Sequence, residues 1–122
     1  MQAGRTLAAT LALLALGAVP GTAHAAPSVT VVEAYGNGSA WVKYTYSCDP
    51  GSATTAGVLV TSTSSGIANS YPVITCDGVT RTAISGTTCV TSCNFRPGTG
   101  VRVTVGVAGV REVKSLGLLP RP

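Results

Sequence analysis

Four cysteines are the residues of this chain whose chemistry is most readily interpreted. Cys48, Cys76, Cys89 and Cys93 form an even set, which in an oxidising compartment favours two disulfides over free thiols. Of the three possible connectivities we expect Cys48 with Cys76 and Cys89 with Cys93, because a tight loop can close the near pair while the distant pair ties two predicted strands. A zinc site is disfavoured, since the C-x3-C spacing has no C-x2-C partner and the only histidine, His24, precedes the expected mature chain.

Two aspartates directly follow the cysteines of the expected long bridge. Asp49 comes after Cys48 and Asp77 after Cys76, so a disulfide that holds the two Cα atoms about 5.5 Å apart would make these carboxylates neighbours. Such a pair could serve a glycosidase or bind calcium. Asp-Pro-Gly and Asp-Gly are also common turn sequences, and we favour the interpretation that both aspartates are turn residues.

Nucleophilic catalysis lacks a general base in this sequence. No histidine follows His24, the cysteines are expected to be oxidised, and the serines include no G-x-S-x-G motif. Lys43 and Lys114 could in principle activate a serine, but both are predicted on outer strand faces, where lysine is an ordinary solvated cation. We therefore predict a protein that is not an enzyme and that needs no cofactor or metal.

Nucleic acid is not an expected partner. The formal net charge is only +4, and Phe95 is the only aromatic residue after Tyr71, so the basic excess and the stacking aromatics of a nucleic-acid surface are both missing. Arg102 and Lys114 are predicted to lie on adjacent strands with the same orientation. We interpret the following residues as a solvated basic face: Arg81, Arg96, Arg102, Arg111 and Lys114.

A long loop is predicted over Ser85–Gly100, where both close-set cysteines lie and aliphatic residues are few. A disulfide at its tip would lower the ordering cost of binding a partner, because it holds the loop in one shape. The alternative is a purely structural disulfide that only keeps the loop from fraying, and both interpretations remain open. The candidate recognition residues are Thr87, Thr88, Asn94, Phe95 and Arg96.

The N-terminal residues 1–25 have the organisation of a signal peptide. Arg5 precedes the apolar run Leu7–Val19, which is too short to span a bilayer, and Ala23-His24-Ala25 forms an A-x-A cleavage site. No lipobox cysteine and no second long apolar stretch follow. We expect cleavage near Ala25 and a single secreted, extracellular domain over residues 26–122, without a membrane anchor.

Period-2 alternation of apolar residues predicts about seven short strands in the mature chain. The run Ala40–Pro50 is the longest of them and is expected to form a strand at the centre of a sheet. The strands are predicted at Ser28–Tyr35, within Ala40–Pro50, and at Gly57–Thr63, Tyr71–Cys76, Val79–Ile84, Val101–Val107 and Arg111–Leu116. The segments around Ser64–Asn69 and over Gly117–Pro122 are predicted to be a polar loop and a loose tail.

Two turns carry specific predictions. Asp77-Gly78 is typical of a two-residue type I′ hairpin, which would return Val79–Ile84 antiparallel to the preceding strand. After Val107 a two-residue turn would place Glu112 opposite Val105 and direct its charge to the buried face. We therefore predict a three-residue turn with a glycine bulge at Gly109.

The pattern as a whole predicts an all-β protein: an immunoglobulin-like antiparallel β-sandwich of about seven strands with two disulfides, with a partly open barrel as the alternative. In order, WVKYTYSCDP, ITCDG and FRPGTGVRVTVGV resemble small secreted immunoglobulin-like domains of high-GC Gram-positive bacteria, several families of which have no assigned function. The resemblance implies a sandwich with a Cys48–Cys76 bridge and without catalytic residues.

The function expected from these observations is that of a secreted non-catalytic binding or structural module, whose partner is an unknown extracellular protein or small ligand. One alternative is a small inhibitor of an extracellular hydrolase, which would insert the loop Thr87–Arg96 into the active site. The tendamistat-type amylase inhibitors are similar only in outline. The second alternative is a carrier of a small apolar ligand. The neocarzinostatin-like chromophore carriers are such proteins, and in them too one disulfide closes a very short loop.

Overall fold

The computed structural model describes residues 26–121, so the predicted signal peptide and its cleavage site lie outside the described residues. Within this range the chain forms nine strands and no helix, and therefore no helix with the length and apolar character needed to cross a membrane. The strands are β2 (Ser28–Gly36), β3 (Ala40–Ser47), β4 (Gly57–Ser62), β5 (Gly66–Ser70), β6 (Arg81–Gly86), β7 (Thr88–Thr91), β8 (Gly100–Val107), β9 (Val110–Gly117) and β10 (Leu119–Pro120).

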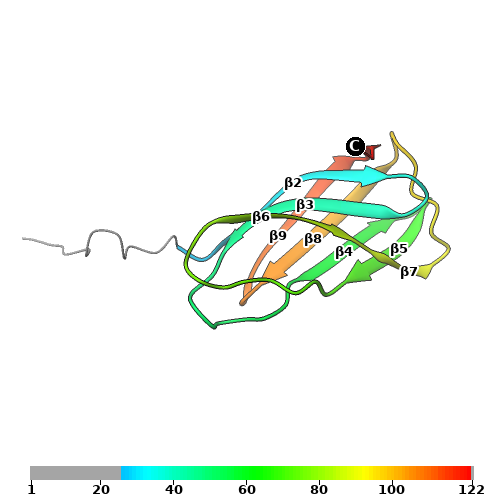
Figure 1. The fold of residues 1–122 in the computed structure, drawn as a ribbon. Coiled ribbons are helices and arrows are strands. Elements are labelled where there is room, and N and C mark those ends of the chain that lie inside the picture. The colour runs from blue at the N-terminus through cyan, green and yellow to red at the C-terminus, as the bar shows by residue number, and fades with distance from the viewer. Residues whose placement is uncertain (1–25, 122) are drawn as a thin grey trace, which may run out of the picture.

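The strands form two sheets that pack face to face (Figure 1). One sheet has the order β10-β2-β3-β6 and the other β7-β5-β4-β8-β9. All pairs are antiparallel except that of β10 with β2. The predicted all-β sandwich with two disulfides is confirmed. It has nine strands instead of about seven, because β5, β7 and β10 were not predicted and the predicted strand Tyr71–Cys76 is absent.

Alternating valines and aromatic residues fill the space between the sheets. The predicted central strand is confirmed: β3 lies between β2 and β6 and directs Val42 and Tyr44 inward. From the facing sheet, β8 contributes Val103 and Val105. Phe95, which belongs to neither sheet, is also completely buried. Each fully buried side chain of this size contributes about 1.5 to 3 kcal/mol of transfer free energy, so these rows hold the layers together.

The predicted strand Tyr71–Cys76 and the Asp77-Gly78 hairpin are wrong. Apart from one isolated bridge between Thr55 and Val73, the segment 71–80 has no ladder. Pro72 has no N–H to donate, and its carbonyl accepts a hydrogen bond from Ala56 at 3.0 Å. The following segment, β6, pairs with β3 instead, because the disulfide draws the Asp77-Gly78 turn toward the end of β3.

The turn between β8 and β9 is also different from the prediction. Val107 pairs with Val110 and Val105 with Glu112, so the loop has two residues, Ala108 and Gly109, both with positive φ. Glu112 and Lys114 consequently lie on the inner side of β9, where both side chains bind the backbone of β2. Their polar groups are satisfied, so the burial penalty assumed in the prediction does not arise.

Three segments expected to be irregular contain strands. β5 lies in the predicted loop 64–69, β7 within Ser85–Gly100, and β10 in the predicted loose tail. The tail is held because Leu118 is buried and exchanges backbone hydrogen bonds with Gly98 and Thr99 at 2.7 and 2.8 Å. β5 and β7 are short and mostly polar, and β10 has only two residues, so the backbone pairing that forms these strands has no counterpart in the hydrophobic pattern.

Candidate binding site

The two cysteine pairs are bonded as predicted. Cys48 and Cys76 lie with their Cα atoms 4.9 Å apart, and Cys89 and Cys93 are 5.7 Å apart. Two backbone hydrogen bonds flank the first bridge, from Gly78 to the Cys48 carbonyl at 2.9 Å and from Gly51 to the Cys76 carbonyl at 3.1 Å. The first bridge therefore fastens the 71–80 segment to the end of β3, whereas the second closes a turn at the end of β7.

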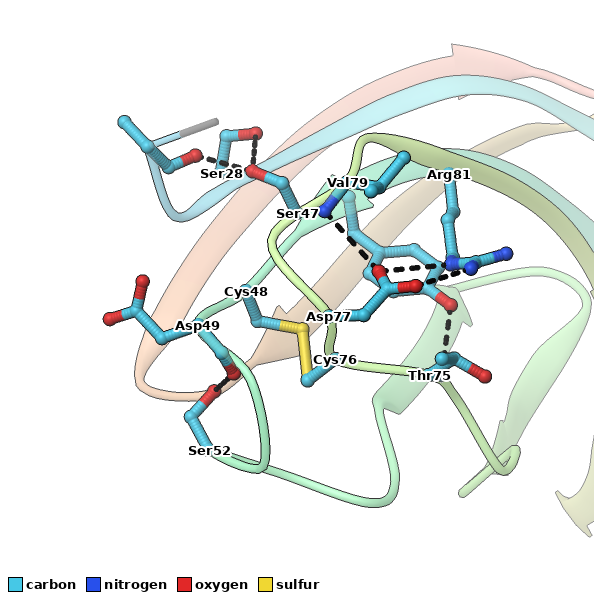
Figure 2. Close-up of a disulfide and its surroundings, with 12 residues drawn as sticks. Ser28, Ser47, Cys48, Asp49, Ser52, Thr75, Cys76, Asp77, Val79 and Arg81 are labelled. Atoms are coloured by element: carbon cyan, nitrogen blue, oxygen red, sulfur yellow. Dashed lines mark hydrogen bonds and ion pairs between the residues drawn. A yellow bond between two sulfur atoms is a disulfide. The ribbon is translucent and has the colours of Figure 1, made fainter. Parts of the chain in front are cut away.

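The two aspartates beside the Cys48–Cys76 bridge point in different directions (Figure 2). Asp77 accepts hydrogen bonds from the Arg81 side chain at 2.5 and 3.2 Å and from the Val79 N–H at 3.2 Å. Hydrogen bonding to Arg81 lowers the pKa of the Asp77 carboxyl and raises that of the Arg81 guanidinium. Asp49 is directed away from this cluster, and its carbonyl accepts from Ser52. The arrangement supports the turn interpretation over a carboxylate dyad.

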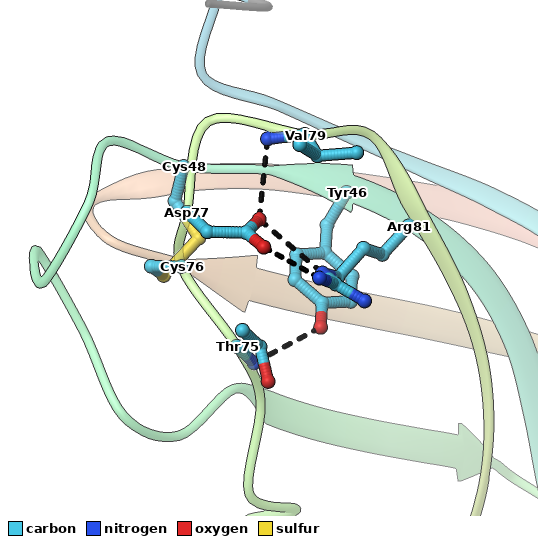
Figure 3. Close-up of polar contacts among 7 residues, drawn as sticks. All are labelled: Tyr46, Cys48, Thr75, Cys76, Asp77, Val79 and Arg81. Carbon is cyan, nitrogen blue, oxygen red and sulfur yellow. Dashed lines mark hydrogen bonds and ion pairs between the residues drawn. A yellow bond between two sulfur atoms is a disulfide. The ribbon is translucent and has the colours of Figure 1, made fainter.

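The polar contacts around Asp77 continue to the core (Figure 3). The Tyr46 hydroxyl accepts a hydrogen bond from the Thr75 N–H at 3.2 Å. This contact and the Asp77–Arg81 ion pair therefore fix the chain on both sides of Cys76. Across residues 26–121 there is no cluster of three or more His, Cys, Asp or Glu side chains suited to a metal.

The predicted recognition residues do not form one surface. Phe95 is buried in the core, with its backbone paired to Gly38, and Thr87 is half-buried, with its hydroxyl bonded to the Ala40 carbonyl at 2.8 Å. Thr88, Asn94 and Arg96 are exposed, and the Arg96 side chain donates to the Asn94 side chain at 3.0 Å. Their role in recognition stays a prediction, and it rests on these three residues and the exposed strand β7.

The basic residues are also distributed differently from the predicted face. Arg81 pairs with Asp77, and the Lys114 ammonium donates to the Val31 carbonyl at 3.1 Å on the inner side of β9. Arg102 is opposite Ser115, so Arg102 and Lys114 face opposite ways. The register instead places Arg102 and Arg111 on one face, the outer face of the five-stranded sheet.

That outer face has two hollows, which sequence reasoning did not find. The larger, of about 840 Å³, is an open groove at one end of the sheet, lined by Thr61, Ser62, Thr63, Ile67, Gly100, Val101, Arg102, Ser115, Leu116 and Gly117. The smaller, here called the glycine hollow, has about 360 Å³ and is lined by Gly57, Val58, Leu59, Asn69, Tyr71, Thr104, Gly106 and Arg111. A volume in this range suits a small organic ligand.

A signal for the glycine hollow was available in the sequence. Gly106 occupies an outward-facing position in the strand that contains the inward-facing Val101, Val103 and Val105. Glycine inside a strand often marks a place where a ligand or another backbone approaches closely. Its partner, Gly57, could not be found in this way, because the pairing of β4 with β8 joins segments far apart in the chain. Comparison with models of known families, with curated proteins and with solved structures finds no match to this chain.

Proposed function

We propose that this protein is a secreted, non-catalytic binding module whose binding surface is the outer face of the five-stranded sheet. The observation that carries the proposal is that two hollows lie on this face, together with the exposed apolar side chains of Leu59, Ile67 and Val113. A sheet face that keeps apolar side chains and hollows in contact with water is typical of a ligand surface. The two disulfides fit an extracellular protein.

The proposal is tested with ¹⁵N-labelled protein and concentrated culture medium of the producing organism, fractionated by size. We expect amide signals of Leu59, Thr104 and Val113 to shift with an active fraction, while those of Thr30, Thr45 and Thr82 on the other sheet stay in place. Shifts that cluster on the β2-β3-β6 sheet, or no shift with any fraction, would contradict the proposed surface.

A second candidate is inhibition of an extracellular hydrolase through β7. This strand is the free edge of the five-stranded sheet, all four of its residues are exposed, and Val90 has 56% of its surface accessible. A free edge can pair with a backbone strand of a partner. Capture of secreted proteins by the wild type and by a Cys89→Ser/Cys93→Ser variant separates the candidates, because an inhibitor loses its hydrolase when the bridge is removed and a module that binds through the sheet face does not.

A further inference from the structure

The floor of the glycine hollow is made by two glycines that nothing inside the chain requires. Gly57 of β4 and Gly106 of β8 pair directly across the sheet, and neither has a positive φ. A Cβ atom built on Gly106 would meet nothing closer than the Val110 carbonyl oxygen at 3.8 Å, and one on Gly57 nothing closer than the Tyr71 ring at 3.8 Å. Glycine weakens a strand, so the pair keeps space open at a cost in strand stability.

The walls of this hollow have complementary chemistry. The Tyr71 ring borders Gly57 and has 72% of its surface exposed, and Leu59, in the next row of the sheet, adds an exposed aliphatic side chain. On the opposite side Arg111 lies beside Gly106. A flat apolar body would therefore lie over the glycines between an aromatic ring and a guanidinium group.

The charge of the outer face is positive. Arg102 and Arg111 project from it, whereas the acidic residues of the mature chain lie elsewhere: Glu33 on β2, Asp49 and Asp77 beside the disulfide, and Glu112 on the inner side of β9. Among residues 26–121 the Arg111 guanidinium has no ion-pair partner. Arginine binds carboxylates through two parallel hydrogen bonds, a geometry that lysine does not provide.

We infer that the glycine hollow binds a small aromatic carboxylate, with its ring over Gly57 and Gly106 against Tyr71 and its carboxylate on Arg111. The inference rests on the proposed function, because it names the ligand class of the same face. A hollow of about 360 Å³ holds a molecule of about a dozen non-hydrogen atoms. Since it is open on one side, we expect a dissociation constant on the order of 10⁻⁴ to 10⁻³ M.

The test titrates the labelled protein with phenylbutyrate, with its neutral amide phenylbutyramide and with acetate, at constant ionic strength. We expect saturable shifts of the Gly57, Leu59 and Gly106 amides with phenylbutyrate. Phenylbutyramide should bind about ten-fold more weakly, because it lacks the charge-assisted contact, and acetate should give no saturable shift, because it lacks the ring.

Two variants locate the contacts. Gly106→Val fills the floor with a side chain that the sheet accommodates, so we expect an unchanged or higher thermal midpoint and at least a ten-fold loss of phenylbutyrate affinity. The control variant Thr82→Val, at an exposed position of the other sheet, should keep the affinity. Arg111→Gln should lower phenylbutyrate affinity to that of the amide and leave the amide unaffected.

The possible failures are distinguishable. Equal affinities for the acid and the amide at this hollow would overturn the carboxylate inference while leaving the sheet face as the binding surface. Undiminished binding by a folded Gly106→Val protein, or no binding of any probe, would overturn the hollow as the ligand site. The proposed function would fall separately, if the active fraction of the culture medium shifts signals only on the other sheet.

Discussion

At the Cys48–Cys76 bridge the two aspartates differ in what they bind. Asp77 is held by Arg81 and by the Val79 N–H, and these hydrogen bonds lower the pKa of its carboxyl. Because the pKa in the folded protein lies below that of the unfolded chain, the ionised carboxylate stabilises the fold at neutral pH. That contribution is lost as the pH falls through the folded-state pKa.

We predict that Asp77→Asn lowers stability at pH 7 and that its difference from the wild type shrinks progressively as the pH falls below about 4, the ordinary pKa of an aspartate in the unfolded chain. The difference should be small, since both partners are exposed to solvent. Urea midpoints measured across this pH range check the prediction. Asp49→Asn is the matched control beside the same bridge. A stability difference between Asp77→Asn and the wild type that does not depend on pH would contradict the prediction.

Trp41 lies between a glycine and an arginine on the outer side of β3. A Cβ atom on Gly86, its partner on β6, would come within 2.7 Å of the indole ring, so the ring lies directly over that glycine. The Arg121 guanidinium covers the ring, 3.7 Å from its centroid, in a cation–π contact. Glycine is therefore required at position 86 by packing, in contrast to positions 57 and 106.

We predict that Gly86→Ala displaces the Trp41 ring, lowers stability by about 1 to 3 kcal/mol through overpacking and shifts the tryptophan emission to longer wavelength. The chain has one tryptophan, so fluorescence reports this site alone. Gly117→Ala is the control, because a Cβ there has no neighbour within 4 Å. Unchanged emission of the Gly86 variant would mean that Trp41 does not lie against β6.

At the level of elements, two charged side chains of β9 connect the sheets. Glu112 accepts a hydrogen bond from the Val31 N–H at 2.6 Å, and Lys114 donates to the Val31 carbonyl at 3.1 Å. β10 pairs with β2 only at Tyr35 and Gly36, so this edge of β2 has no backbone strand beside Val31. The side chains supply the hydrogen bonds that a strand would otherwise provide.

We predict that Glu112→Ala costs about 1 to 3 kcal/mol, because the N–H of the buried Val31 loses its acceptor. Glu112→Gln keeps an acceptor oxygen and should cost less. Native-state hydrogen exchange at the Val31 amide gives a specific measurement, with faster exchange expected in the alanine variant. Ser115→Ala, on the outer side of the same strand, should leave this exchange rate unchanged. Equal exchange rates at Val31 in the Glu112→Ala and Ser115→Ala variants would contradict a hydrogen bond between Glu112 and Val31.

At the level of the whole molecule, the domain is small and its bridges act on very different chain lengths. Cys48–Cys76 spans 28 positions and Cys89–Cys93 spans 4. In the chain-entropy model the first bridge contributes about 3.6 kcal/mol and the second about 2 kcal/mol. A domain of this size has a net stability of only about 5 to 10 kcal/mol, so the longer bridge is a large part of it.

We predict that replacing Cys48 and Cys76 by serine lowers the free energy of unfolding by at least 3 kcal/mol, because it also loosens the 71–80 segment. Replacing Cys89 and Cys93 should cost about 2 kcal/mol or less, since the exposed end of β7 can fray without opening the core. Guanidinium unfolding of the two double variants measures both values. A larger loss of unfolding free energy in the Cys89/Cys93 variant than in the Cys48/Cys76 variant would contradict the prediction.

The sequence alone determined the sandwich, the disulfide pairing and the central place of β3. These follow from alternation of valines and aromatics and from cysteine spacing, which are local signals that burial imposes on the chain. The short strands β5, β7 and β10 were not predicted, because backbone pairing with a neighbour stabilises them and they carry no hydrophobic repeat.

The candidate site was decided by tertiary structure. Two charged side chains occupy the inner face of β9 because the backbone of Val31 on β2 hydrogen-bonds to them. These contacts permit the register that turns Arg111 outward. The same register of β8, together with its pairing to β4, brings Gly106 beside Gly57. Sequence separation conceals such pairings, because the register of each strand depends on which neighbour satisfies its backbone and its charges.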